Sequence, residues 1–298
     1  MSIAWVFPGQ GSQKVGMADP ILSLDDAEAR FSIASQMMGR DLLAICKGHA
    51  EPEDTPTDLN NTLNTQPALF VVESLLVDEL KRQGRQASLV AGHSLGELVA
   101  LYAAEVFDFT TGLKLMLRRS ELMANAGGGS MTAVIGFDRD ELNELIAATN
   151  DVVIANDNSS GQVVISGKPE AVNTISSNLT CKLAAPLPVS GAFHSPFMAD
   201  ASTTFAKELD QVIFQQATIP VMSNTDPNPT KDGELLKQRL KNQMTKGVRW
   251  REAMDLMAQS GITRVIEIGP GKVLSNLIKR AHSEISTSQL SSASDLGH

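Results

Sequence analysis

Residues 92–97 read Gly-His-Ser-Leu-Gly-Glu and place one serine between two glycines. An apolar run at residues 88–91 precedes the motif, and a helical pattern covers residues 95–104. A Gly-x-Ser-x-Gly segment between a strand and a helix is typical of a nucleophile elbow, a turn so tight that larger side chains would collide beside the serine. The turn would place the Ser94 hydroxyl at a helix N-terminus, where unpaired N–H groups stabilise a developing oxyanion. The alternative is a Gly-Ser turn that only caps a helix, and the flanking strand and helix favour the catalytic interpretation.

A serine nucleophile needs a general base within hydrogen-bond reach, and the chain offers five histidines. His93 adjoins the serine, but its side chain points away in an elbow, which indicates a supporting role. His49 lies in a polar acidic loop, His282 in the polar part of the last helix, and His298 at the C-terminus. His194 lies where two predicted domains join and therefore borders a cleft. A lone loop histidine is usually a surface residue, but the need for a base makes His194 the candidate.

Two adjacent arginines lie in a helix predicted over residues 110–126, and helical geometry separates them. Arg118 shares a face with polar residues, whereas Arg119 shares one with Leu115 and Leu122. We therefore expect Arg118 to face solvent and Arg119 to point inward, where an unpaired cation is costly. Two interpretations stay open at this point: a buried salt bridge within the protein, or a bidentate clamp for a substrate carboxylate.

The composition excludes several classes of protein. With 298 residues, of which 42% are hydrophobic, the chain can bury a full core, and its net charge of −9 disfavours nucleic-acid binding. No apolar run approaches a membrane span, and no signal peptide opens the chain, so no membrane partner is expected. Cys46 and Cys181 lie far apart without metal-ligand spacing, which indicates a reduced, cytoplasmic protein. We expect a monomer with no metal site and no tightly held cofactor.

Strand and helix patterns alternate in the first and last parts of the chain, which predicts an α/β fold with a parallel sheet covered on both faces. The predicted strands cover residues 3–7, 88–91, 219–224 and 264–268. The predicted helices cover residues 67–83, 95–104, 110–126, 196–209, 233–244 and 251–260, and a last helix ends at residue 280. The Ser-rich tail at residues 286–298 is the one segment where we expect disorder.

A segment with a different order of predicted strands and helices separates these two parts. Strands are predicted at residues 131–137, 152–156, 162–166 and 182–189, with helices at residues 139–148 and 169–179. The order strand-helix-strand-strand-helix-strand is that of a ferredoxin-like unit. We therefore predict a discontinuous large domain, residues 1–127 and 190–298, with a small ferredoxin-like subdomain, residues 128–189, inserted into it. Clefts between domains are favoured ligand sites.

These motifs together resemble the malonyl-CoA:acyl carrier protein transacylase family, which includes the acyltransferase domains of fatty-acid and polyketide synthases. The resemblance extends over essentially the whole chain. It depends on the segments at residues 7–13, 92–97, 158–164, 191–194 and 267–274, and on Arg119 in its helix. It implies a hydrolase-like parallel-sheet core with an inserted ferredoxin-like subdomain, in agreement with the organisation predicted above. It also implies transfer of a malonyl group from malonyl-CoA to the phosphopantetheine thiol of holo acyl carrier protein, for fatty-acid biosynthesis and without a cofactor.

The roles of the family's residues carry over by position. Ser94 would take the malonyl group in a ping-pong reaction, and His194 would be its base. The backbone N–H groups of Gln10 and Leu95 would form the oxyanion hole. Arg119 would bind the malonyl carboxylate, which favours the clamp over the internal salt bridge.

Three further positions bear on the resemblance. Gln243 matches the position whose backbone carbonyl orients the histidine, so no third triad carboxylate is expected. Phe193, directly before the histidine, resembles malonyl-selective members because it crowds an α-methyl branch. Gly247 departs from the family, which commonly has proline there.

Acyl carrier proteins are acidic, so an acidic enzyme needs local positive charge to bind one. Residues 231–251 carry seven lysines and arginines against two acidic residues, and Lys272, Lys279 and Arg280 form a second basic group. A basic helix face usually only interacts with solvent, and this is the favoured interpretation of the first group. The alternative is that the carrier protein docks there, through Lys237 and Lys241.

Other functions share part of this pattern. A serine thioesterase or esterase would use the same nucleophile with water as acceptor, but Arg119 and the inserted subdomain argue against it. A malonyl-loading subunit of a polyketide or malonate decarboxylase pathway shares the motifs and is poorly separated by the sequence. A non-catalytic malonyl-CoA-binding or scaffold protein is disfavoured by the intact pair Ser94 and His194.

Overall fold

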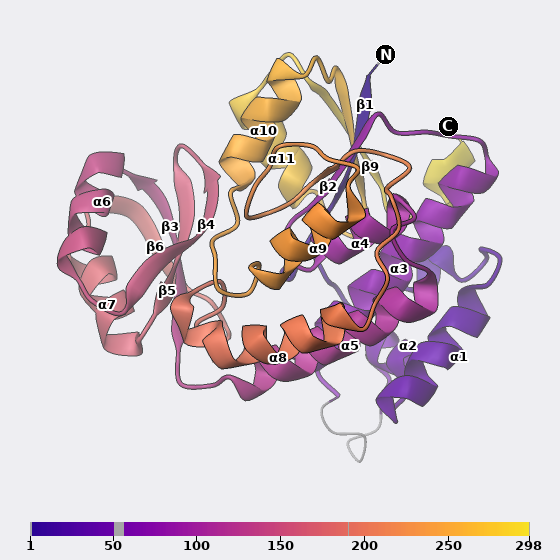
Figure 1. Ribbon diagram of the computed structural model, residues 1–298, viewed down its shortest axis with the longest axis horizontal. Coiled ribbons are helices and arrows are strands. Elements are labelled where there is room, and N and C mark those ends of the chain that lie inside the picture. The colour runs from indigo at the N-terminus through magenta and orange to yellow at the C-terminus, as the bar shows by residue number, and fades with distance from the viewer. Residues whose placement is uncertain (1, 51–56, 190, 298) are drawn as a thin grey trace.

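The computed structural model describes residues 2–50, 57–189 and 191–297. Within these residues a five-stranded parallel sheet forms the core of the larger part of the molecule, in the order β7-β2-β1-β8-β9 (Figure 1). The strands are β1 Ile3–Phe7, β2 Leu89–Gly92, β7 Val221–Met222, β8 Arg264–Ile268 and β9 Ser286–Leu290. Strands of a parallel sheet are buried on both faces and read as nearly continuous apolar runs, as β1 does.

Helices cover both faces of this sheet, and alternate residues of β1 divide the core between them. Trp5 and Phe7 pack with α3 Thr62–Arg82, α4 Gly96–Ala103 and α5 Phe109–Asn125. Ala4 and Val6 pack on the opposite face with α10 Trp250–Gln259 and α11 Val273–Ala281. The remaining helices of the larger part are η1 Asp19–Ile21, α1 Ala27–Met38, α2 Leu42–Lys47, η2 Pro196–Met198, α8 Ala199–Asp210, α9 Gly233–Lys241 and η3 Ala293–Gly297.

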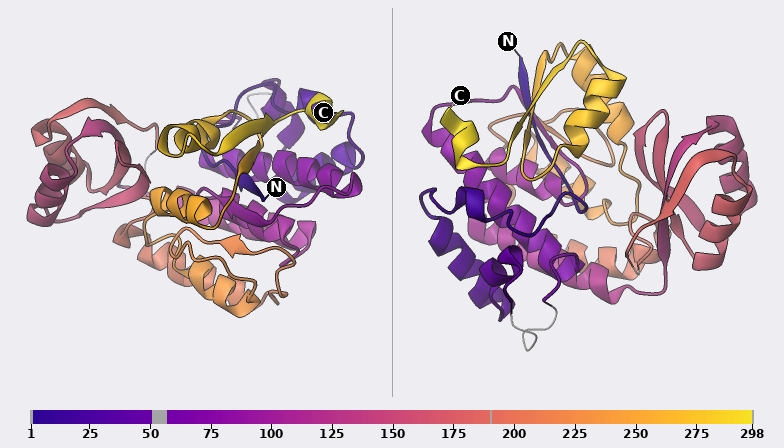
Figure 2. Two further views of the ribbon diagram at one scale, coloured as in Figure 1. Left: turned by 90° about the horizontal axis from the view of Figure 1, so that it is seen from above. Right: turned by 180° about the vertical axis from the view of Figure 1, so that it is seen from behind.

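A second, antiparallel sheet lies at one end of the molecule (Figures 1 and 2). Its strands are β3 Ser130–Phe137, β4 Val152–Ser159, β5 Gln162–Gly167 and β6 Cys181–Pro186, in the order β4-β5-β3-β6. Helices α6 Arg139–Ala148 and α7 Pro169–Asn178 share an apolar core with the sheet. The predicted fold class, a parallel-sheet core with a ferredoxin-like unit, is therefore confirmed. The domain boundaries at residues 127/128 and 189/190 stay a prediction, and residue 190 lies outside the described residues.

The helix predicted over residues 67–83 begins five residues earlier, at Thr62. The side chain of Asn61 accepts the N–H of Leu63 and caps the helix, so Pro67 lies inside it and not at its start. Proline removes the hydrogen bond to the carbonyl four residues before it. That carbonyl, of Leu63, instead accepts a hydrogen bond from Arg40 Nη2 at 3.0 Å, which explains why the helix tolerates the proline.

The expected disorder of the tail is wrong for the residues that the structure describes. Strand β9 pairs in parallel with β8, from Arg264 beside Ser286 to Ile268 beside Leu290. Leu290 and Leu296 are buried, so the polar segment is held by a strand ladder and two apolar anchors. His298 lies outside the described residues. None of the described helices is long and apolar enough to cross a membrane.

Candidate active site

The turn between β2 and α4 has the geometry of a nucleophile elbow. Ser94 has a φ of 53°, in the left-handed region that non-glycine residues rarely adopt. A Cβ at Gly92 would lie 1.9 Å from the backbone carbon of Gly96, and a Cβ at Gly96 would lie 2.3 Å from the carbonyl oxygen of Phe7. Neither position accepts a side chain, so the two glycines are required by the close approach of β1, β2 and α4.

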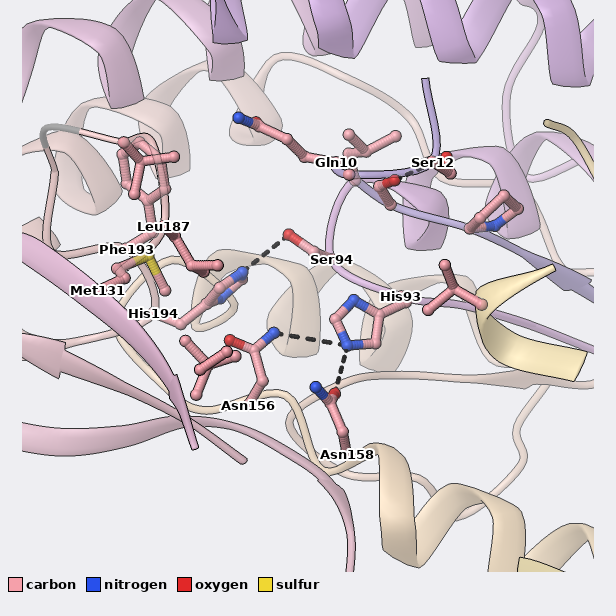
Figure 3. Close-up of a pocket in the computed structure, with 18 of the residues that line it drawn as sticks. Gln10, Ser12, His93, Ser94, Met131, Asn156, Asn158, Leu187, Phe193 and His194 are labelled. Carbon is pink, nitrogen blue, oxygen red and sulfur yellow. Dashed lines mark hydrogen bonds between the residues drawn. The ribbon is translucent and has the colours of Figure 1, made fainter. Parts of the chain in front are cut away.

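His194 lies opposite this serine (Figure 3), with its Nε2 2.8 Å from Ser94 Oγ. Its Nδ1–H donates to the backbone carbonyl of Gln243 at 2.9 Å, which leaves Nε2 as the basic nitrogen. The imidazole is only 3% exposed. Burial, and then the charge of Arg119, lower the pKa of His194 to about 3. A neutral imidazole that faces a hydroxyl is suited to accept its proton.

Arg119 points inward from α5 and is 1% exposed, whereas Arg118 pairs with Glu121 at the surface. The guanidinium donates to Gln243 Oε1 from Nε at 3.2 Å and from Nη2 at 2.9 Å, and to Gln66 Oε1 from Nη1 at 2.6 Å. Its Nη2 also lies 3.2 Å from Ser94 Oγ. Within the described residues no carboxylate forms an ion pair with it, so the salt-bridge interpretation is wrong. Burial lowers the pKa of Arg119 to about 10, which leaves a positive charge at neutral pH with neutral partners only.

Gln10 and Leu95 line the same cavity as Ser94. Phe7 and Gly92 are in register between β1 and β2, so the loop after β1 runs beside the elbow. In the part of the chain that the structure describes, neither N–H donates a hydrogen bond. Two unpartnered donors next to a serine hydroxyl are the arrangement that an oxyanion hole requires.

Of the histidines that the structure describes, the other three form no hydrogen bond with the serine hydroxyl. His93 Nε2 hydrogen-bonds Asn158 Oδ1 at 2.8 Å and lies 3.4 Å from Asn156 Nδ2, and thus ties the elbow to strand β4 (Figure 3). Burial lowers its pKa, so it is a neutral structural link. His282 pairs with Asp255, and His49 is an exposed residue after α2.

A cavity of about 240 Å³ opens beside these groups, between the two sheets. Its apolar wall includes Met123, Met131, Leu187 and Phe193, three of which are labelled in Figure 3. Ser94, His194 and Arg119 all line it. In the described residues no group of three or more histidine, cysteine, aspartate or glutamate side chains could hold a metal ion.

Three side chains of the site had no predicted role: Gln66, Asn224 and Glu97. Gln66 lies in α3 and accepts a hydrogen bond from Arg119, and Asn224 Oδ1 accepts the N–H of Ser94 at 2.7 Å. The polar run Asn-Thr-Gln at residues 64–66, directly before the apolar stretch at residues 67–72, is a sequence signal that could have identified Gln66. Asn224 follows the short strand β7, and nothing near it in the sequence indicates its contact with the elbow.

Lys237 and Lys241, the two lysines singled out in the first basic group, are both paired with carboxylates. Lys237 is 8% exposed, pairs with Glu234 at 3.1 Å and lies over the ring of Phe214. Lys241 pairs with Asp210. These intrachain ion pairs weaken the case for docking through the two lysines, and docking on this group stays a prediction.

The second basic group differs from these two lysines in its exposure and in its ion pairs. Lys272, directly before α11, and Lys279 and Arg280 within it are exposed, and no ion pair with a carboxylate involves them within the described residues. Val273, Leu274 and Leu277 of the same helix line the cavity. The exposed basic residues therefore lie on an element that forms one wall of the site.

Comparison with known proteins agrees with this geometry. A family model described as an acyl transferase domain matches residues 4–297. The chain belongs to this acyltransferase family. Over 296 residues the acyltransferase is 47% identical to the malonyl CoA-acyl carrier protein transacylase of Synechocystis sp., covering 99% of each chain.

Solved structures and a second relative extend the comparison. The crystal structure of the Synechocystis transacylase superimposes with a TM-score of 0.95 and covers 100% of this acyltransferase and 99% of the other chain. A malonyl-transacylase in complex with a type II polyketide acyl-carrier protein gives a TM-score of 0.91 at 34% identity, covering 99% and 98%. A polyketide biosynthesis malonyl CoA-acyl carrier protein transacylase of Bacillus subtilis is 38% identical, covering 93% of this chain and 96% of the relative.

Proposed function

We propose that this acyltransferase moves a malonyl group from malonyl-CoA to the phosphopantetheine thiol of a holo acyl carrier protein, for fatty-acid biosynthesis. The observation that carries the proposal is the buried guanidinium of Arg119, which has no carboxylate partner in the described residues and lies 3.2 Å from Ser94 Oγ. A free carboxylate at the far end of the acyl group would complete its hydrogen bonds and compensate its charge. A neutral acetyl group would leave that charge unpaired, so the site discriminates against it.

In the first step Ser94 Oγ attacks the thioester carbonyl carbon of malonyl-CoA. His194 Nε2, 2.8 Å away, accepts the hydroxyl proton. The negative charge of the tetrahedral intermediate develops near the N–H groups of Gln10 and Leu95. When the carbon–sulfur bond breaks, the protonated His194 returns the proton to the departing CoA thiolate, and malonyl-serine is left.

The second step reverses this order with another thiol. The phosphopantetheine thiol of the carrier protein gives its proton to His194 and attacks the malonyl ester. The carbon–oxygen bond breaks, and Ser94 Oγ takes the proton back. No cofactor is needed, because every proton and bond is accounted for by the serine, the histidine and the two thiols.

We assign the choice between malonyl and methylmalonyl donors to the wall of the cavity. Phe193 lines the cavity next to His194, and the family resemblance implies that a phenylalanine at this position crowds an α-methyl branch. We therefore propose malonyl as the preferred donor over methylmalonyl. A cytoplasmic location, a monomeric state and the domain boundaries at residues 128–189 are part of the same proposal and come from the sequence.

The test is intact mass spectrometry after separate incubation with malonyl-CoA and acetyl-CoA, followed by peptide mapping. We expect a malonyl adduct on Ser94, little acetyl adduct, and transfer of the malonyl group when holo carrier protein is added. Ser94→Ala should bind malonyl-CoA without forming the adduct. Turnover by Ser94→Ala would refute the nucleophile assignment, and rapid hydrolysis without carrier protein would favour a thioesterase.

A polyketide carrier protein is the second candidate acceptor, because the Bacillus subtilis relative of that name matches nearly the full chain. Assay of fatty-acid and polyketide carrier proteins side by side separates the two. A ratio of kcat/KM that favours the polyketide protein would replace the fatty-acid assignment but keep the chemistry.

A further inference from the structure

Glu97, the last residue of the elbow motif, is a buried carboxyl that none of the steps above uses. It lies in the first turn of α4 and is 0% exposed. Its Oε2 accepts two hydrogen bonds, from Gln243 Nε2 at 2.7 Å and from the backbone N–H of Asn224 at 3.1 Å. Burial of a carboxyl is costly unless hydrogen bonds or a nearby opposite charge compensate it. One bond connects Glu97 to Arg119 through Gln243, and the other connects it to the Ser94 elbow through Asn224.

The first connection fixes Arg119 through the amide of Gln243. The amide nitrogen of Gln243 donates to Glu97 and to the backbone carbonyl of Ser94, at 2.7 Å and 2.9 Å. Both partners are acceptors, so the amide has one orientation, with its oxygen toward Arg119. That oxygen accepts both Nε and Nη2 of the guanidinium. Without Glu97 the amide would lose the partner that sets its direction.

The second connection fixes the elbow through Asn224. The backbone N–H of Asn224 donates to Glu97, while its side chain accepts the N–H of Ser94 at 2.7 Å and donates to the carbonyl of Gly92 at 2.6 Å. Asn224 comes directly from the loop after β7, so it has no helix or strand of its own to hold it. The bond to Glu97 anchors this loop against the strained turn.

The negative charge of Glu97 acts on Arg119 without direct contact. Burial lowers the pKa of Arg119, and the negative charge of Glu97 opposes that effect. A carboxylate in direct contact would occupy the guanidinium and compete with the substrate. The amide of Gln243 lies between the two, so the negative charge stabilises Arg119 without direct contact. One Nη1–H and the Nη2–H that faces Ser94 then stay available to the malonyl carboxylate.

We propose that Glu97 is a positioning residue for malonyl selectivity: its Oε2 orients the Gln243 amide toward Arg119 and anchors Asn224 against the Ser94 elbow. Glu97 touches no reacting atom, so it acts only through Gln243 and Asn224. The inference rests on the proposed malonyl transfer.

The test compares Glu97→Met with Glu97→Gln by the ratio of serine acylation rates with malonyl-CoA and acetyl-CoA. Glu97→Met removes the acceptor at nearly constant volume, and we expect the malonyl-to-acetyl ratio to fall about tenfold or more. Glu97→Gln keeps an acceptor oxygen for both donors and should restore the ratio to within about threefold of wild type. Glu73→Met is the matched control, because Glu73 is equally buried but makes no hydrogen bond to the site. This control should keep the wild-type ratio.

A double variant tests whether Glu97 acts through the amide of Gln243. If Glu97 acts through the amide, Glu97→Met should lower the ratio far less in a Gln243→Met background than in wild type. If Glu97→Met does not fold, Glu97→Asp withdraws the carboxylate from both donors and gives the same readout. An unchanged ratio in Glu97→Met, or equal falls in both backgrounds, would overturn the inference. Failure of wild type to form any malonyl adduct would instead refute the proposed function.

Discussion

At the scale of single residues, the surroundings of His194 set its protonation. The imidazole is enclosed by protein and faces the charge of Arg119, and both effects favour the neutral form. The folded pKa of about 3 lies well below the usual 6.5, so the base form persists into acid. The unfolded chain binds a proton at this residue as the pH falls below 6.5, and the folded chain does not, so this histidine contributes a loss of stability between 6.5 and about 3.

The rate of serine acylation should therefore show no decline between pH 7 and 5, where an ordinary histidine would become protonated. Stopped-flow release of thiol from malonyl-N-acetylcysteamine measures this without the phosphates of CoA. Arg119→Met removes the second cause of the depressed pKa, so its acid decline should begin at a higher pH. A decline centred near 6.5 in wild type would contradict the neutral-base assignment.

At the scale of elements, the elbow depends on how closely three segments approach. Strand β1 runs beside β2, and α4 starts directly under the carbonyl of Phe7. The strained φ of Ser94 persists only because the surrounding elements hold the turn. Any movement of α4 away from β1 would therefore release the serine from its position opposite the histidine.

Gly96→Ala should destabilise the protein by at least ~2 kcal/mol, because its Cβ would clash with backbone that cannot move without displacing β1. Urea unfolding measures this change, and acylation of Ser94 should fall in parallel. Gly161→Ala is the control, since a Cβ there meets no atom within 4 Å. We expect its stability to stay within ~0.5 kcal/mol of wild type. Equal stability of the two variants would exclude the close approach as the reason for the glycine.

The C-terminal strand gives a second test at this scale. Leu290 is 2% exposed at the end of β9, so Leu290→Ala should lower the free energy of unfolding by about 2–4 kcal/mol. Ser294→Ala changes an exposed residue of the same tail and should have little effect. If both variants unfold like wild type, the tail does not contribute to the core.

At the scale of the whole molecule, the enzyme and the carrier protein are both acidic, so docking needs a local group of positive charges on the enzyme. The basic residues of α9 pair with carboxylates of the same chain. Lys272, directly before α11, and Lys279 within it are exposed, and α11 also lines the cavity. A phosphopantetheine arm that enters the cavity would bring its carrier protein against this helix. Local charge of this kind raises the rate of association.

The double variant Lys272→Glu/Lys279→Glu should raise KM for holo carrier protein about tenfold. KM for malonyl-N-acetylcysteamine, which carries no phosphate, should not change. Lys114→Glu/Lys207→Glu reverses two exposed charges on α5 and α8 that do not line the cavity, and should leave both constants unchanged. Equal effects on both substrates, or an effect of the control, would remove α11 as the docking surface.

The sequence by itself determined the features that depend on local pattern. The period of apolar residues predicted most strands and helices, and the glycines around Ser94 predicted the turn, because only glycine fits where backbones approach so closely. Helical spacing also separated Arg119 from Arg118. The order of elements predicted two sheets. The boundaries of α3 and the ordered tail were missed because Arg40 and strand β8, distant in sequence, stabilise them.

Only the tertiary structure decided which polar groups meet. Gln66, Glu97, Asn224 and Gln243 come from four separate segments, and no periodicity relates an amide on one segment to a guanidinium on another. Whether Lys237 is a free charge or a buried, paired one also depends on Glu234 and Phe214, which the fold places beside it. Hydrogen bonds and ion pairs are short-range and directional, so they are set by the final packing and not by the pattern along the chain.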